Sequence, residues 1–290
     1  MKNNILFITV VVLFFSCRPK PKNEKLEYNN IIIVSDLSSR INLLPNKDMS
    51  EINSLINYFR NECVKPGIKS NDKSSIYFSA LTEQEFFGID IDSIKDLAPK
   101  QMFVNSTGEF TNNGLDFKIL KFKENIKHTY ETIKNPGLDL ISILNEKIHK
   151  NSVIKQDITF KTSGKIDSIN YNNHLYVFTD GYLEYLNPEQ NDQFYFGKPQ
   201  IERVRQFCNS NKIGVEIALK NNSQLSLPPL KGEKNRFINL HIVETHERDK
   251  DFVHNKYLNE DGLRDNQILE AVWRKWALES GFKSFEWKKY

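Results

Sequence analysis

The sequence predicts an α/β protein with a doubly wound, mostly parallel sheet and helices on both of its faces. Short and almost continuous apolar runs recur along the chain, as strands covered on both faces require. Amphipathic helical patterns separate these runs, and such alternation favours parallel strands joined by right-handed crossovers. The 290 residues are enough for one large domain with a sizeable core.

Five segments are expected to form strands. Four are short apolar runs, whereas the fifth alternates more, with Ile238, Leu240 and Ile242 on one face, as expected toward an edge of the sheet. The five segments are residues 30–35, 75–81, 174–179, 213–219 and 237–243.

Four segments carry apolar residues at helical spacing, which predicts helices over 48–65, 138–150, 199–211 and 266–281. Trp273 and Trp276 lie on the apolar stripe of the last helix, where we interpret them as core residues and not as a binding face. Long loops or insertions are expected over 82–121, 150–173, 182–198 and 244–266.

The first seventeen residues have the pattern of a secretory signal. Lys2 precedes an apolar run over 5–15, which is too short to cross a hydrocarbon core about 30 Å thick. The sequence Leu-Phe-Phe-Ser-Cys that ends at Cys17 resembles the processing box of bacterial lipoproteins, which implies that Cys17 is lipidated. An uncleaved or ordinarily cleaved signal is the alternative.

These features predict three segments: a lipoprotein signal peptide over 1–17, a flexible tether over 18–28 and a folded domain over 29–290. The protein is then exported to the cell envelope and lipid-anchored to a bacterial membrane, facing the periplasm or the cell surface. Arg18, Lys20 and Lys22 of the tether would lie near lipid headgroups.

The overall charge gives no reason to expect nucleic acid as a partner, because 40 basic residues are nearly balanced by 37 acidic ones. Glycine-rich dinucleotide and Walker loops are missing from the sequence, so nucleotide binding is not predicted either. Cys63 and Cys208 lie among apolar residues at helical spacing and are expected to be core thiols, although a disulfide between them stays open.

Polar groups gather where two of the predicted strands end. The first strand runs into Ser-Asp-Leu-Ser-Ser-Arg at 35–40, and a later strand runs into Thr-Asp-Gly-Tyr-Leu-Glu-Tyr at 179–185. In a parallel sheet the ligand site lies outside the carboxyl ends of the strands. We therefore expect Asp36 and Asp180 to lie on the same rim of the sheet.

These two loops resemble the metal-ion-dependent adhesion site of von Willebrand factor A domains, a family with a Rossmann-like fold. The family holds a divalent cation with D-x-S-x-S in one loop, a threonine in a second and an aspartate in a third. The resemblance implies that Asp36, Ser38 and Asp180 are metal ligands. Arg40 replaces the second serine, and Leu138 stands where the threonine is expected, next to Asp139 as an additional candidate ligand.

The two replaced ligands leave three interpretations of the rim. In the first, the remaining oxygens hold Mg²⁺, Ca²⁺ or Mn²⁺ while Arg40 turns outward. In the second, the Arg40 guanidinium lies between Asp36 and Asp180 in place of the ion. In the third, these groups only cap the helices that follow the strands.

The resemblance implies binding of a protein partner, here an unidentified envelope protein, and not catalysis. Arg40, Tyr182 and Tyr185 are expected to form the partner-binding rim, because exposed aromatic side chains bury a large area at little entropic cost. Further aromatic residues follow at 194–196. A satellite core beneath a long loop is the alternative explanation for these aromatic residues.

A metal-dependent hydrolase that uses Asp36 on the same rim is the alternative function. The loop is similar to that of haloacid-dehalogenase phosphatases, which carry a nucleophilic aspartate after the first strand. That family needs a second aspartate as proton carrier at the position of Ser38. A serine hydrolase is not predicted, since the G-x-S-x-G pattern is missing from the sequence.

A zinc site is a further candidate, from the cluster of His241, Glu244, His246 and His254. The cluster lacks the His-Glu-x-x-His spacing that puts two histidines on one helix face, and a transition from strand to loop would splay the side chains. We interpret this stretch as a solvated loop.

Overall fold

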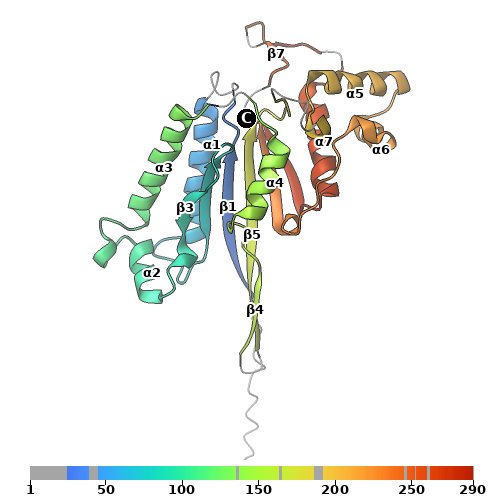
Figure 1. The fold of residues 1–290 in the computed structure, drawn as a ribbon. Helices are drawn as coiled ribbons and strands as arrows, with labels where there is room; N and C mark the ends of the chain where they lie inside the picture. Colours follow the sequence, from blue (N-terminus) through green and yellow to red (C-terminus); the bar gives the residue numbers. More distant parts are fainter. Residues whose placement is uncertain are drawn as a thin grey trace, which may run out of the picture.

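The computed structural model describes residues 25–38, 45–134, 137–162, 165–185, 192–244, 247–251, 253–259 and 262–289. Their main feature is a seven-stranded sheet with the order β3-β2-β1-β5-β6-β9, to which β4 adds by pairing with β5 (Figure 1). Its strands are β1 (Lys25–Ser35), β2 (Ser75–Ala80), β3 (Phe87–Asp90), β4 (Ile158–Thr162), β5 (Lys165–Thr179), β6 (Ile238–Glu244) and β9 (Ser284–Lys289).

Most strand pairs of the sheet are parallel. Only the β2–β3 and β4–β5 pairs in the described sheet are antiparallel. A separate two-stranded hairpin of β7 (Lys250–Asp251) and β8 (Lys256–Tyr257) follows β6. The predicted α/β fold class is therefore confirmed.

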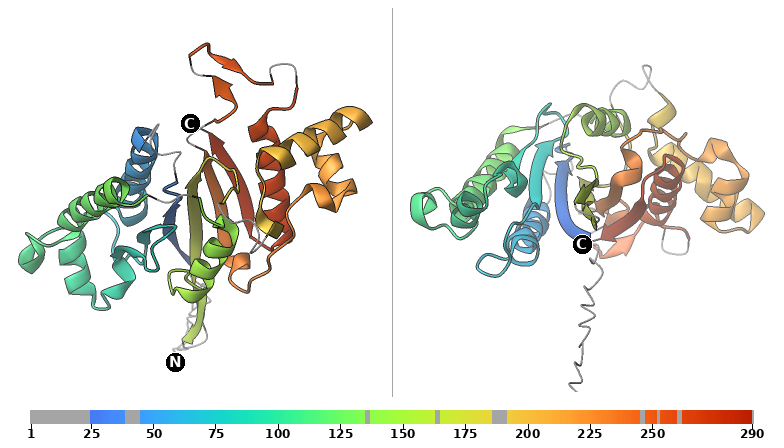
Figure 2. Two further views of the ribbon diagram at one scale, coloured as in Figure 1. Left: turned by 45° about the horizontal axis from the view of Figure 1, so that its top comes forward. Right: turned by 90° about the horizontal axis from the view of Figure 1, so that it is seen from below.

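Helices cover both faces of the sheet (Figure 2). One face carries α1 (Pro45–Tyr58), which continues into a π-helical turn (Phe59–Val64), together with α2 (Leu97–Val104) and α3 (Leu115–Thr132). The other carries α4 (Leu140–Lys150), α5 (Lys198–Asn211), α6 (Val215–Asn221) and α7 (Asp265–Glu279).

The alternation of side chains along β1 divides the core into two layers. Ile31 and Ile33 are buried beneath α1 and α3, whereas Ile32 and Val34 are buried against the helices of the other face. Successive strand residues point to opposite faces, so a strand covered on both sides is mostly apolar on both of them. This is why residues 31–34 of β1 appear in the sequence as an unbroken apolar run.

One predicted strand is wrong. Residues 213–219 fall mostly within helix α6, which starts after Gly214 and buries Ala218 and Leu219 while Ile217 stays 52% exposed. A short apolar run fits a strand or a helix equally well, and the packing of α6 on α7 decides for the helix. Regular elements also occupy the segments where loops were expected, namely β3, α2, β4, the first half of β5 and the start of α3.

The two described cysteines are free and lie on opposite faces of the sheet. Cys63 is 1% exposed in the layer with α1, and Cys208 is 2% exposed in the layer with α7, which settles the open question of a disulfide between them. Trp273 and Trp276 are 0% and 2% exposed, as expected for core residues.

The sheet begins earlier than the predicted domain boundary. Strand β1 starts at Lys25, whose Cα is paired with Ser168 of β5, so residues 25–28 belong to the sheet. The expected signal peptide and Cys17 lie outside the described residues. Within the described ranges, no helix combines the length and the apolar composition that a membrane span needs.

Candidate functional site at the rim of the sheet

Asp36 and Asp180 lie on the same rim because the strands that precede them are parallel neighbours. Ser35 is in register with Phe178, and the Asp36 amide donates to the Phe178 carbonyl at 2.9 Å. A cavity of about 350 Å³ opens beside them and is lined by Asp36, Ser38, Leu138, Glu184, Tyr185 and Arg248, among others. Asp36 and Asp180 therefore lie on the same rim of the sheet, as predicted from the sequence.

Asp36 is 7% exposed, and both of its carboxylate oxygens accept hydrogen bonds. Oδ1 accepts from the Ser38 amide at 3.2 Å, and Oδ2 accepts from the Ser38 hydroxyl at 3.3 Å and from the Thr179 hydroxyl at 3.4 Å. The D-x-S pattern thus closes a tight turn, and the threonine before Asp180 ties this turn to β5.

Asp180 is 1% exposed and is paired with a guanidinium. Its Oδ2 accepts from Arg248 Nε at 2.6 Å, and its Oδ1 accepts from the Tyr182 amide at 3.2 Å. Arg248 Nη1 donates to Glu184 Oε2 at 2.5 Å, and the guanidinium carbon lies 4.3 Å from the centre of the Tyr182 ring. Burial disfavours the charged form of Arg248, but the two carboxylates outweigh burial and raise its pKa.

The cation beside Asp180 therefore comes from the segment after β6. Arg40, which we considered for this role, lies outside the described residues. Arg248 forms ion pairs with both Asp180 and Glu184.

Asp139 serves as a helix cap. Its side chain accepts from the Ser142 amide at 3.1 Å at the start of α4, which satisfies one of the free amides of the first helical turn. Leu138 lines the rim cavity with an apolar side chain.

The rim residues as folded do not fit a hard divalent cation. Asp180 Oδ2 is in ion-pair contact with Arg248, and the Leu138 side chain supplies no oxygen, so the described residues offer fewer oxygen donors than the octahedron that Mg²⁺ prefers. Among the described residues, no group of three or more His, Cys, Asp or Glu side chains is arranged to hold a metal ion. A cation at this rim would have to displace Arg248.

The two predicted rim tyrosines differ in exposure. Tyr182 is 5% exposed, its hydroxyl donates to Asp265 Oδ2 at 2.6 Å, and burial and this hydrogen bond raise its pKa. Tyr185 is half-buried in the cavity wall, with its ring edge-on to that of Tyr195 at 5.4 Å. Phe194 and Phe196 are buried in the core, so only part of the aromatic cluster faces the cavity.

Only glycine fits at position 181. Gly181 has φ +84°, and a Cβ there would lie 2.4 Å from the Trp287 ring. Its carbonyl accepts from the Trp273 indole at 2.9 Å. The turn that presents Asp180 is thus fixed by the buried Trp273 and the partly buried Trp287, which explains the Thr-Asp-Gly pattern.

The described segment 247–251 carries Arg248 and is bound to the start of α7. Asp249 accepts from the Asp265 amide at 3.2 Å, and Glu247 accepts from Arg264 at 2.5 Å and from the Asn266 amide nitrogen at 2.8 Å. These bonds flank Arg248 on both sides in the sequence. The guanidinium is therefore positioned by the fold and not by chance side-chain geometry.

Glu244, at the end of β6, is a buried carboxyl group beside this segment. It is 2% exposed and accepts from the Trp287 indole at 2.8 Å. Burial raises its pKa to about 7, although the indole hydrogen bond acts in the opposite direction.

The histidines considered for zinc lie apart. His241 and His174 join across β5 and β6 through their Nε2 and Nδ1 atoms at 3.0 Å, and His241 Nδ1 lies 2.7 Å from Glu286. His254 pairs with the exposed Asp251 at 2.6 Å, and His246 lies outside the described residues.

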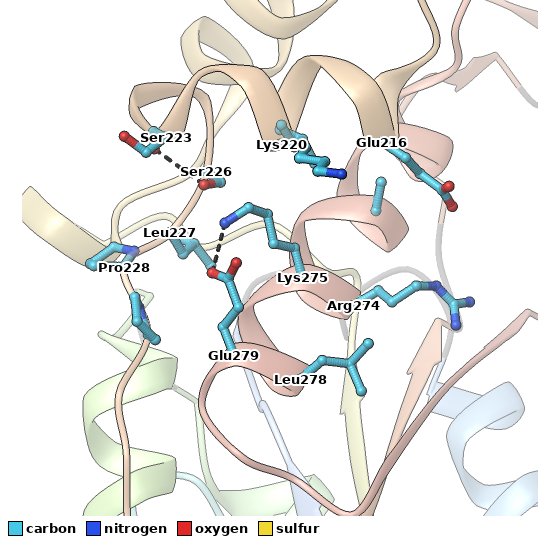
Figure 3. Close-up of a pocket in the computed structure, with 13 residues that line it drawn as sticks. Glu216, Lys220, Ser223, Ser226, Leu227, Pro228, Arg274, Lys275, Leu278 and Glu279 are labelled. Carbon is cyan, nitrogen blue, oxygen red and sulfur yellow. Dashed lines mark hydrogen bonds and ion pairs between the residues drawn. The ribbon is translucent and has the colours of Figure 1, made fainter.

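A larger cavity of about 850 Å³ lies between α6 and α7 (Figure 3). Its floor is apolar, and Lys275 and Glu279 on its wall pair with each other at 2.6 Å. Ligand sites combine an apolar lining with convergent polar groups. The polar groups of this cavity are spread along its wall, so we place the functional site at the rim.

Two rim residues, Glu184 and Arg248, are not among those predicted from the sequence. Glu184 follows Asp180 by four residues, in a loop that the sequence already places at the rim. The segment after β6 can be placed at the rim by the same rule, because the carboxyl ends of β5 and β6 are neighbours, but the rule does not single out Arg248 within it.

Comparisons with known proteins give little. No family model matches the chain, and no curated protein matches its sequence. Among solved structures, the chain is similar to the human COPII-coat protein Sec24c, at 8% sequence identity and a TM-score of 0.32. The likeness covers 93% of this chain and 30% of the Sec24c chain. It is too weak to support any inference about family or function.

Proposed function

We propose that this chain is a lipid-anchored envelope protein whose von Willebrand factor A-like domain binds a protein partner at the rim. One observation carries the proposal: the guanidinium of Arg248 in the rim cavity, where the adhesion site of that family would hold a metal ion. The Asp36, Ser38 and Asp180 loops support the family assignment, because they lie on one rim with the spacing of that site.

Arg248 gives the cavity a fixed donor. Its Nη2 makes no hydrogen bond to any described residue, while Nε and Nη1 are held by carboxylates. Because Asp180 and Glu184 together carry two negative charges against the one positive charge of Arg248, the partner group that suits this donor is an uncharged acceptor, such as a backbone carbonyl or a side-chain amide. Tyr185 and Tyr195 supply an aromatic wall for apolar contact.

An internal cation removes the need for an exchangeable one. We therefore propose that partner binding does not require Mg²⁺, Ca²⁺ or Mn²⁺, in contrast to the adhesion sites that the loops resemble. Binding that disappears in EDTA and returns with Mg²⁺ would restore the metal-assisted version.

The partner can be identified by photo-crosslinking from the cavity wall. Benzoylphenylalanine placed at Tyr185 of the full chain, expressed in its own host, should give one major adduct for mass spectrometry. Arg248→Gln should then weaken binding of the purified partner about ten-fold or more, since a buried charge-assisted contact is worth roughly 1.5–3 kcal/mol. Arg274→Gln is the matched control, because Arg274 forms an ion pair with Glu270 on the surface of α7. Equal binding by both variants would refute the proposal.

Hydrolysis by Asp36 is the competing function. Both oxygens of Asp36 are engaged in the turn, which favours a structural role over nucleophilic attack. Turnover of p-nitrophenyl phosphate with Mg²⁺ that disappears in Asp36→Asn would overturn the binding proposal.

A further inference from the structure

The β4–β5 hairpin projects from the body of the protein at the end of the sheet opposite the rim (Figures 1 and 2). Strand β1 begins at Lys25, in register with Ser168 of β5, and Ser168 is in register with Thr159 of β4 on its other side. Residues 165–167 therefore have only β4 as a described neighbouring strand. We call residues 158–162 and 165–169 the ribbon.

The ribbon exposes large apolar side chains. Ile158 is 49% exposed and Phe160 is 40% exposed, and as residues two apart on one strand they share a face. Ile158 is in register with Ile169, which packs with Tyr28 and Tyr171 in a small core at this end of the sheet. The exposed pair thus lies on the same face as this small core, with Asp167 directly opposite Phe160.

Exposed apolar side chains on such a ribbon are unfavourable in water. A two-stranded hairpin is marginally stable unless a third strand or another surface covers its apolar face. Neither described helices nor described strands cover Ile158 and Phe160. Ile158 and Phe160 are apolar at positions where contact with water alone would favour polar residues. An apolar surface outside the chain is therefore the simplest partner for this face of the ribbon.

The chain that precedes β1 indicates which surface that is. The 24 residues before Lys25 contain the apolar run over 5–15 and Cys17. Eight residue steps separate Cys17 from Lys25 and span at most about 29 Å when fully extended. A membrane that holds the chain at or before Cys17 is therefore within reach of the end of the sheet where the ribbon projects.

We propose that the ribbon lies on the membrane that anchors the N-terminus, with Ile158 and Phe160 inserted between lipid headgroups. The proposal rests on the lipid anchor proposed above. Lys161 is exposed on the other face of β4, which points away from the lipid in this orientation and toward water, as its charge requires. Anchor and ribbon together then make two attachment points.

Two attachment points fix the orientation of the domain. Strand β1 runs from Lys25 beside the ribbon to Ser35 beneath Asp36, and its 11 residues span roughly 36 Å. The rim site is therefore presented away from the lipid surface, facing the space where a partner protein can reach Arg248.

The test uses cysteine labels on the full, processed chain. Phe160→Cys and Val253→Cys are labelled with an environment-sensitive dye, and Val253 is the control because it is 87% exposed in the β7–β8 turn. Cys63 and Cys208 are 1% and 2% exposed, so unmodified protein gives a low background. The proteins are reconstituted with vesicles of phosphatidylethanolamine and phosphatidylglycerol, with and without nitroxide lipids, and vesicle binding is checked by flotation.

We expect a several-fold rise and a blue shift of emission at position 160 on vesicle binding, with quenching by nitroxide lipids and no change at 253. Flotation without quenching at 160 would overturn the ribbon contact and leave the anchor intact. Failure to float would overturn both. A blue shift at 160 without vesicles that grows with protein concentration would assign the face to a second copy of the chain. If Phe160→Cys does not fold, Ile158→Cys carries the same test. Partner binding at the rim is measured in solution and is decided separately.

Discussion

Removal of the Arg248 guanidinium should destabilise the fold measurably. Arg248→Gln leaves the Asp180 carboxylate, 1% exposed, without its ion-pair partner. Loss of one partner from a fully buried ion pair costs about 3–5 kcal/mol. The side chains of Arg248 and Glu184 are 30% and 29% exposed, so water takes over part of the lost interaction. We therefore expect the free energy of unfolding to fall by about 2–3 kcal/mol, below the fully buried range.

A double-mutant cycle identifies which carboxylate is responsible. Asp180→Asn keeps the acceptor for the Tyr182 amide but removes the charge. If Arg248 acts through Asp180, the double variant should lose less stability than the sum of the two single variants, with a coupling energy of about 1–2 kcal/mol. Glu184→Gln should cost less, about 0.5–1 kcal/mol, because that pair is more exposed.

Urea unfolding followed by circular dichroism measures both effects. The midpoint should fall in Arg248→Gln without a change in the slope m, because the surface exposed on unfolding stays the same. Arg274→Gln, which breaks an exposed ion pair, should stay within about 0.5 kcal/mol of the unmodified protein. An unchanged midpoint in Arg248→Gln, or strict additivity with Asp180→Asn, would refute the assignment of Arg248 as the internal cation of the rim.

Three further predictions concern the rim and the sheet. Glu244→Gln should stabilise the protein by about 2–3 kcal/mol near pH 8 and have little effect near pH 4.5. The buried Glu244 carboxyl has a pKa of about 7 and keeps its proton between pH 4.5 and 7, whereas the same group in the unfolded chain loses it. Glu244 therefore lowers the free energy of unfolding as the pH rises from 4.5 to 7. Thermal unfolding at the two pH values tests this, and an equal effect at both would contradict it. Burial and the neighbouring His241 lower the pKa of His174 to about 4, so this residue acts in the opposite sense. Its effect is that the free energy of unfolding decreases as the pH falls from about 6.5 to 4. His174→Phe should flatten that decrease in a series of urea midpoints measured at different pH values. Gly181→Ala should cost about 2–4 kcal/mol in urea unfolding, because the positive φ and the close Trp287 ring both penalise a Cβ, whereas Gly214→Ala, with nothing within 4 Å of the added carbon, should cost less than 1 kcal/mol.

Much of the sheet can be predicted from the sequence because buried parallel strands carry their own signal. The apolar runs over 30–35, 75–81, 174–179 and 237–243 all lie in or overlap observed strands. Strands that are covered on both faces are mostly apolar, and this makes them stand out in the sequence, although the run over 213–219 shows that a short helix can look the same. The rim position of Asp36 and Asp180 follows from strand polarity alone, since the carboxyl ends of parallel neighbours meet at one edge.

The short segments are less predictable, for a physical reason. Residues 213–219 have too few apolar positions to separate a period of two from one of 3.6, and their burial against α7 selects the helix. The first part of β5, residues 165–173, mixes polar and apolar residues and carries no such run, because it begins in the ribbon, where its only described neighbouring strand is β4. In both segments, the secondary structure depends on the neighbouring elements and not on the segment's own residues.

The sequence by itself determined the fold class, the two layers of the core and the rim that holds Asp36, Ser38 and Asp180. Only the tertiary structure decided which cation faces Asp180. Arg248 follows Asp180 by 68 residues in the sequence. An ion pair produces no periodic pattern in the sequence, so nothing in it indicates which of the 40 basic residues pairs with Asp180. Charge pairing depends on distances of a few ångströms between side chains on different elements, and those distances exist only after the sheet has formed.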